Sequence, residues 1–211
     1  MKLCIISDTH NKHKRLPPLP EADVIIHAGD FTSVGHSHEI VNFMQWYSKL
    51  PYKYKIVIAG NHDWLFETHR LLALEKVPEG VIYLEDSGVE LDGVKFWGTP
   101  VQLPFNNWAF NKPEHKLVPH WQAIPDDTDV LITHCPPFTI LDWSIYDLKH
   151  TGSPSLYFEV IQRIKPKVHI FGHIHGSYGK KIIEGTTFIN ASNLDEDYMC
   201  VNPPMIFEVN A

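Results

Sequence analysis

The sequence predicts an α/β fold in which a largely parallel β-sheet is accompanied by a second sheet made of hairpins. Five short runs rich in Val and Ile predict buried strands, because a strand covered on both faces is apolar throughout; the runs are residues 2–6, 23–27, 54–59, 129–133 and 167–171. Helical patterns lie between them, at residues 38–49, 64–75 and 155–164. This alternation is typical of βαβ units, whose strands run parallel.

The second sheet is expected from two regions that lack a helical pattern. Residues 81–98 and 178–209 contain strand-like pieces joined by Gly, Asp-Gly and Pro-Pro turns, which is typical of antiparallel hairpins. The Pro-containing stretches 99–113 and 135–154 predict long loops, and loops of that length are often functional. Because 211 residues with 44% hydrophobic content can bury one sizeable core, we expect a single domain over residues 1–211.

Charge and cysteine content exclude several classes of protein. The formal net charge of -7 argues against a basic surface that follows phosphates, so we expect no duplex nucleic acid as a partner. No run of about 18 apolar residues is present, so we expect no membrane span. Cys4, Cys135 and Cys200 are odd in number and far apart, which disfavours a disulfide framework or a cysteine zinc site. These features favour a soluble protein of the reducing cytoplasm.

Residues that can bind a metal follow each of the five apolar runs, within three residues of its end. In chain order they are Asp8-Thr9-His10, Gly29-Asp30, Gly60-Asn61-His62-Asp63, His134 and Gly172-His173-Ile174-His175. Because the carboxyl ends of parallel strands form the ligand crevice of an α/β sheet, we expect these clusters to converge. The glycines fit positions where the backbone turns sharply or passes close to an ion.

The side chains in these clusters indicate the kind of ion. Carboxylates, an amide oxygen and imidazoles suit borderline and hard divalent ions, and no thiolate is required. The ligands are too numerous for one ion, and a carboxylate can bridge two cations about 3.5 to 4 Å apart. We therefore expect two divalent ions per chain, with Mn²⁺ foremost and Fe, Zn, Mg, Ni or Co as alternatives.

The order DxH, GD, GNHD, a downstream His and GHxH resembles the signature of the calcineurin-like metallophosphoesterases and spans residues 8–175. The resemblance implies a four-layer αββα sandwich of two mixed β-sheets flanked by helices. It further implies that Asp8, His10 and His175 hold the first ion, that Asn61, His134 and His173 hold the second, and that Asp30 bridges them. His62 is implied to be the catalytic histidine beside the scissile phosphate, and Asp63 to support it.

Several longer segments are similar to the small metallophosphoesterase-domain (MPPED) family. They are LPYKYKIVIAGNHD, GTPVQLPFNNWAF, ITHCPP, HIFGHIHGSYG and FINASN followed by NPPMIFEV. This resemblance implies phosphodiester hydrolysis, with cyclic nucleotides among the substrates. The expected partner is thus a small phosphate ester, with a nucleotide favoured, whereas the oligomeric state is not predicted.

Substrate contacts are expected from the aromatic loop that contains Trp108. Its indole offers a face on which a base can stack, with Asn106 and Asn107 as donors near the phosphate; the alternative is a buried loop anchor. His13 lies just beyond the first metal motif and is a further candidate for a phosphate contact. His27 and His169 lie within apolar runs and are expected in the core.

The expected reaction is attack on phosphorus by a hydroxide held between the two ions. A diester is favoured over a monoester because the motif segments contain no Lys or Arg to neutralise the extra charge of a monoester. Two alternatives remain open: a phosphomonoesterase acting on phosphoproteins or nucleotides, and a non-catalytic scaffold of the same fold. A scaffold has no need to keep His62, His134 and His173 together, so the intact set favours an enzyme.

Overall fold

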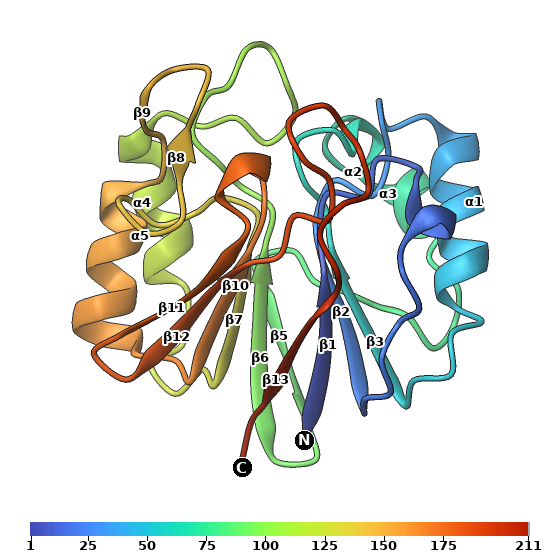
Figure 1. Cartoon of the computed structure of the whole chain (residues 1–211), viewed down its shortest axis with the longest axis horizontal. Coiled ribbons are helices and arrows are strands. Elements are labelled where there is room, and N and C mark those ends of the chain that lie inside the picture. Colours follow the sequence, from blue (N-terminus) through green and yellow to red (C-terminus); the bar gives the residue numbers. More distant parts are fainter. Residues whose placement is uncertain (211) are drawn as a thin grey trace.

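The computed structural model describes residues 1–210 and consists of two stacked β-sheets with helices on both outer faces (Figure 1). The first sheet has the spatial order β13 (Met205–Glu208), β1 (Lys2–Ile6), β2 (Val24–Ala28), β3 (Tyr54–Ile58) and β4 (Ile82–Tyr83). The second has the order β11 (Gly179–Ile183), β12 (Thr186–Asn190), β10 (Val168–Phe171), β7 (Val130–Thr133), β6 (Val94–Thr99) and β5 (Ser87–Leu91). The predicted α/β fold with two mixed sheets flanked by helices is confirmed.

The five predicted apolar strands are all present, but they are divided between the sheets. β1, β2 and β3 run parallel in the first sheet, whereas β7 and β10 run parallel in the second. The expectation that one parallel sheet holds all five was wrong, because an apolar run reports that both faces are covered and does not identify the neighbouring strand. The hairpins β5–β6 and β11–β12 formed as predicted, while β13 pairs antiparallel with β1 and so joins the first sheet.

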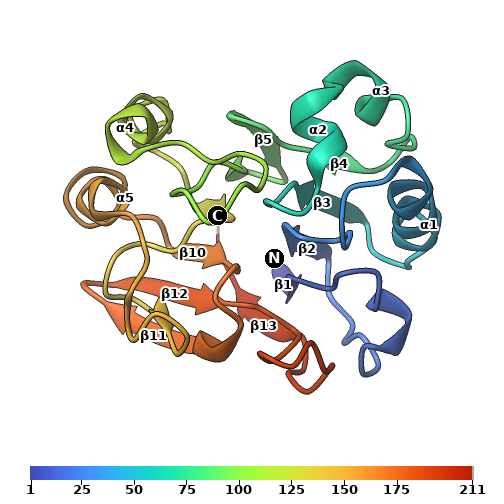
Figure 2. The same cartoon turned by 90° about the horizontal axis from the view of Figure 1, so that it is seen from above.

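The helices cover the outer faces of the two sheets (Figures 1 and 2). α1 (Ser37–Tyr47), α2 (Trp64–Thr68) and α3 (Arg70–Leu74) lie on the first sheet, and α4 (Glu114–Gln122) and α5 (Pro154–Glu159) lie on the second. The helix predicted over residues 64–75 is interrupted at His69, whose φ of -140° is not helical. α4 was not predicted, since it contains Pro119, a residue usually avoided in helix interiors.

Three apolar layers hold the sandwich together, one between the sheets and one under each group of helices. The alternation along β1 shows how one strand serves two of them: Leu3 and Ile5 pack between the sheets, while Cys4 and Ile6 pack under the helices. All four side chains are fully buried. Because strands packed on both faces have little freedom to shift, their carboxyl ends form a rigid base for the loops that follow.

The carboxyl ends of the parallel strands of both sheets lie at the same edge of the sandwich, at the top of Figure 1. The predicted long loop after β7 covers part of this edge and contains the short hairpin β8 (Trp143–Ser144) and β9 (Lys149–His150). None of the described helices combines the length and the apolar character that a membrane span requires. Cys4, Cys135 and Cys200 are not disulfide-bonded.

Candidate metal and active site

The first cluster of possible ligands comprises Asp8, His10 and His175, which follow β1 and β10. The Nε2 atoms of His10 and His175 lie 3.3 Å apart, and His175 Nε2 lies 3.6 Å from Asp8 Oδ1. One ligand atom from each of the three residues lies within 4.8 Å of the others. The loops after two strands from different sheets therefore bring these side chains to one point, as the sequence predicts.

A second cluster lies beside the first and is centred on the amide of Asn61, which follows β3. Asn61 Oδ1 lies 3.0 Å from His134 Nε2 and 2.9 Å from His173 Nδ1. Asp30, His134 and His173 form a group whose ligand atoms lie within 4.8 Å of one another. An amide oxygen, a carboxylate and two imidazoles thus point at a common position.

Asp30 lies between the two clusters. Its Oδ2 is 3.3 Å from His134 Nε2 in the second cluster and 3.8 Å from His10 Nε2 in the first. The side chain is almost completely buried. A carboxylate placed in this way has the geometry to bridge two neighbouring cations.

Three of the histidines are oriented by backbone carbonyls on the side away from the cluster. The Nδ1 atoms of His10, His134 and His175 lie 3.1, 2.9 and 3.0 Å from the carbonyl oxygens of Thr32, Ala28 and Asp195, respectively. In the neutral ring, an Nδ1–H that donates to a carbonyl leaves Nε2 unprotonated and free to bind a cation. The Asp8 carboxylate is held in turn by the Ser192 hydroxyl, which donates to Oδ2 at 2.9 Å.

The backbone at these positions is unusual. Asp8, Asp30 and His173 have φ values of 52°, 56° and 70°, in the left-handed region that non-glycine residues rarely adopt. Such conformations cost on the order of 1–3 kcal/mol each and cluster at functional sites. The strand-end glycines are needed for space: a Cβ at Gly60 would lie 2.3 Å from Asp30 Oδ1, and one at Gly172 would lie 2.1 Å from Asp8 Oδ2. The donor set and its close packing fit divalent cations.

Burial and neighbouring charges shift the pKa values of the clustered side chains in the metal-free protein. Burial alone would raise the pKa values of Asp8 and Asp30, yet neighbouring histidines lower both below the ordinary range. Burial would lower the pKa of His134, but the Asp30 carboxylate raises it to about 9. Burial lowers the pKa values of His10 and His173 to about 3, so these two imidazoles are neutral at pH 7 and can donate a lone pair.

His62 lies at the edge of the two clusters. Its Nδ1 is 2.6 Å from the carbonyl oxygen of Ser33, and one of its ring nitrogens lies within 4.8 Å of ligand atoms of His10 and Asp30. The indole of Trp108 stacks on its other side, with ring centroids 3.9 Å apart. The imidazole is therefore fixed by a hydrogen bond and an aromatic contact while it stays near the clusters.

Asp63 is buried behind the site. Its carboxylate accepts hydrogen bonds from the backbone N–H groups of Asp30, Thr32 and Gly60 at 2.9, 3.0 and 2.8 Å. Burial, followed by the charge of Asp30, raises its pKa to about 7. The side chain does not line the pocket described below. Asp63 therefore contacts the loops that carry the candidate ligands and does not face the space for the substrate.

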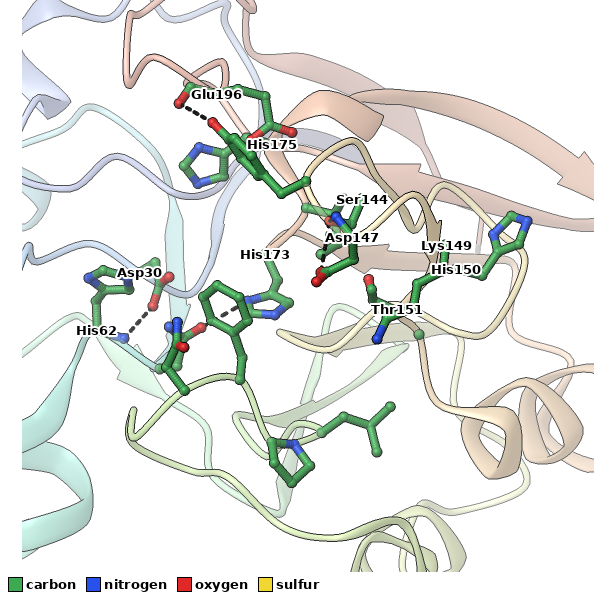
Figure 3. A pocket seen from close by; sticks show the side chains of 18 of the residues that line it. Asp30, His62, Ser144, Asp147, Lys149, His150, Thr151, His173, His175 and Glu196 are labelled. Carbon is green, nitrogen blue, oxygen red and sulfur yellow. Dashed lines mark hydrogen bonds between the residues drawn. The ribbon is translucent and has the colours of Figure 1, made fainter.

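A pocket of about 780 Å³ opens over the clusters. Figure 3 shows Asp30 and His62 on one side of it and Asp147 and Thr151, from the loop after β7, on the other. A pocket of this size accommodates an organic molecule and not merely a phosphate ion. Residues from three further loops, after β6, β10 and β12, also line the wall, namely Leu103, Pro104, Phe105, Asn106, Ile174, Glu196 and Tyr198.

The predicted substrate contacts are distributed unevenly. Asn106 lines the pocket, whereas Asn107 and Trp108 do not. His13 lies outside the pocket, buried against Phe43 and Trp46 at ring-centroid distances of 5.4 and 4.8 Å. His27 and His169 are fully buried, as expected.

Two stretches of the pocket wall were not assigned from the sequence. Tyr146, Asp147 and Lys149 belong to a stretch that was predicted only as a long, functional loop. Glu196 and Tyr198 belong to a C-terminal turn for which no functional signal was identified. Neither stretch carries a ligand-type motif, so only the fold reveals its position.

Comparison with known proteins supports the sequence resemblance. The family model for calcineurin-like phosphoesterase matches residues 1–177. Metallophosphoesterase domain-containing protein 1 of Homo sapiens is 38% identical over 227 residues, which cover 97% of this chain and 69% of that protein. A UPF0046 protein of Caenorhabditis elegans is 37% identical, with 99% of this chain and 81% of that protein covered. The resemblance to the MPPED family is confirmed.

Among solved structures, TT1561 of Thermus thermophilus has a TM-score of 0.64 at 14% identity, and the match covers 90% of this chain and 88% of that one. At this identity the likeness concerns the fold alone. The family match and the relatives above supply the assignment, and they agree with two adjacent sets of side chains at the strand ends that could hold a metal ion. The chain belongs to the calcineurin-like phosphoesterase family, which supports metal-dependent hydrolysis of phosphoesters as its activity.

Proposed function

We propose that the protein is a phosphodiesterase that holds two divalent cations, Mn²⁺ foremost, with Asp30 as the shared ligand. The position of Asp30 carries the proposal, since its Oδ2 lies within 3.8 Å of one imidazole from each cluster. In this assignment Asp8, His10 and His175 complete the first site, and Asn61, His134 and His173 complete the second. When bound, two such cations supply an activated water and neutralise charge on the phosphoryl group.

The residues around this centre have separate tasks. With both ring nitrogens of His62 protonated, the Nδ1–H donates to the Ser33 carbonyl and the Nε2–H can donate a proton to the departing oxygen or stabilise charge on the phosphoryl group. Asn61 and the histidines of the two clusters would fix the positions of the cations. Asp63 holds the loops that carry Asp30 and Asn61. The volume beyond the clusters receives the organic part of the ester.

The preference for a diester rests on the charge of the pocket wall. Among the described residues that line the pocket, Lys149 is the one lysine, and arginine is absent. The carboxylates of Asp147 and Glu196 also line it. A monoester dianion gains more from cationic side chains than a diester monoanion does, so this wall favours the diester. Phe105 and Asn106 supply an aromatic surface and an amide suited to a nucleotide. A nucleotide substrate stays a prediction, and so does a cytoplasmic location.

The experiment is metal analysis of the purified protein followed by parallel kinetics. The values of kcat/KM are compared for a 2',3'-cyclic or 3',5'-cyclic nucleotide, an aryl diester and the matching aryl monoester, each with Mn²⁺. The proposal expects two ions per chain and faster hydrolysis of the diesters. A monoester preference of tenfold or more would overturn the diesterase assignment and leave the two-metal site intact. Metal-bound protein without hydrolysis of any of the esters would favour a scaffold.

A further inference from the structure

The C-terminal part of the chain contributes to the first ligand cluster although it lies beyond the segment that the family model matches, residues 1–177. The Ser192 hydroxyl donates to Asp8 Oδ2, and the backbone of Asn193 donates to the Ser7 carbonyl at 2.9 Å. The side-chain oxygen of Asn193 accepts the Ser7 N–H at 3.1 Å. Residues 192 and 193 therefore fix the backbone just before the first metal-binding motif.

Tyr198 makes the closest aromatic contact of this C-terminal segment with the cluster. Its ring lies 5.1 Å from the imidazole of His10 and 5.1 Å from that of His175, in both cases edge to face. The two imidazoles themselves lie 5.3 Å apart, so the three rings form a compact triangle. Tyr198 also lines the pocket, together with His10 and His175.

The turn that carries Tyr198 is held firmly. The Asp195 carboxylate accepts the N–H groups of Asp197 and Met199 at 3.0 and 2.7 Å, and Tyr198 adopts a left-handed φ of 58°. The Asp195 carbonyl accepts His175 Nδ1–H. From the other side, the Lys12 ammonium donates to the Tyr198 carbonyl and lies 5.7 Å from the centre of its ring. The turn thus joins the first metal motif near the N-terminus to His175.

We propose that Tyr198 is a positioning residue for the first metal site: its ring holds the His10 and His175 imidazoles in the orientation that binds the cation. The inference rests on the proposed function, because it assumes that these histidines are ligands. The Asp195 carbonyl fixes the tautomer of His175 through Nδ1, and the ring of Tyr198 packs against the same imidazole. Residues that support metal ligands in this way typically change metal affinity 10- to 100-fold when they are removed.

The test is titration of metal-free protein with Mn²⁺ by calorimetry, with unfolding midpoints measured in parallel. Tyr198→Ala is expected to weaken one of the two sites by about 10- to 100-fold. Tyr198→Phe keeps the ring and is expected to retain the wild-type affinity within about twofold. Met199→Ala is the matched control, since Met199 lies in the same turn, is 58% exposed and does not line the pocket.

Two single-site backgrounds identify the affected site. With His134→Ala only the first site remains, and adding Tyr198→Ala should weaken it further. With His175→Ala only the second site remains, and Tyr198→Ala should change nothing. The inference would be overturned if Tyr198→Ala kept the wild-type metal affinity at both sites. It would also be overturned if Tyr198→Phe and Tyr198→Ala lost equal amounts of metal affinity. Tyr198→Leu replaces Tyr198→Ala should the latter not fold. Fewer than two ions in the wild-type protein would instead overturn the proposed function.

Discussion

The indole of Trp108 stacks on the imidazole of His62, with ring centroids 3.9 Å apart and planes inclined by 25°. The sequence suggests Trp108 as a platform for a base, but in the structure this face of the indole is occupied by the candidate catalytic histidine. Trp108 therefore acts on His62, and Phe105 is the aromatic residue of this loop that lines the pocket.

Trp108→Ala is accordingly expected to lower kcat by a similar factor for a cyclic nucleotide and for an aryl diester, because both reactions depend on the orientation of His62. Phe105→Ala is expected to raise KM for the nucleotide selectively. Parallel kinetics on both substrates check this pair of variants. A selective effect of Trp108→Ala on the nucleotide would return the base-stacking role to Trp108.

His62→Ala is expected to retain both metal ions and to lower the rate by about 10²- to 10⁴-fold, since the side chain is assigned to proton transfer and charge stabilisation. The measurements are metal content and kcat/KM, with His134→Ala as the control that loses an ion. Loss of metal as severe as in the control would show that His62 is itself a ligand, a position that its distance to Asp30 allows.

Asp30→Ala is expected to remove more than one ion per chain, because the carboxylate lies within reach of both clusters. Elemental analysis after dialysis measures the loss, and His175→Ala, which affects the first cluster only, is the comparison. Retention of both ions with full turnover in Asp30→Ala would contradict the ligand assignment.

Asp63→Asn is expected to destabilise the fold by about 1–3 kcal/mol, because the amide can accept on one atom only and its NH₂ group faces backbone donors. Metal affinity should fall as well, since those donors belong to the loops of Asp30 and Gly60. Denaturant unfolding and metal titration measure the two effects. An unchanged unfolding midpoint would argue against this structural role.

The buried histidine His169 is expected to make the fold sensitive to acid. Burial lowers its pKa from 6.5 to about 3, so between these values the unfolded chain binds a proton that the folded chain does not. Stability contributed by this group is full above pH 6.5 and falls as the pH decreases; at pH 5.5 the loss is about 1.4 kcal/mol. Urea unfolding at pH 7.5 and 5.5 should show a smaller difference in His169→Gln, and an equal difference in both proteins would contradict the prediction.

The sequence predicts the convergence of the metal-competent side chains well and the pocket wall poorly, for physical reasons. Asp8, Asp30 and His134 follow apolar runs whose ends must emerge at one edge of the sandwich, so their convergence can be inferred from local pattern. Tyr146 and Tyr198 reach the pocket through loops without periodicity, and their positions depend on long-range contacts such as the hydrogen bond from the Tyr146 hydroxyl to the Glu196 carbonyl. Such long-range contacts produce no local sequence pattern from which they could be predicted.

Buried histidines illustrate the same limit. His13 stands three residues after the end of the first metal motif, yet the short 3-10 turn His13–Arg15 directs it toward Phe43 and Trp46. Proximity in the chain therefore did not predict proximity to the pocket. His27 and His169, by contrast, lie inside strands, where the neighbouring apolar residues already indicate burial.

The pairing of β13 with β1 affects how the protein folds. β1 is followed directly by Asp8 and His10, and Lys2 pairs with Glu208 while Met1 donates to the Val209 carbonyl. Contacts this distant in sequence form slowly, because a long loop must close before they become favourable. During synthesis on the ribosome, the outer edge of β1 stays unpaired until residues 205–208 have emerged, and an unpaired edge can associate with other chains. Stable metal uptake at the first site is thus expected only after translation of the C-terminal segment.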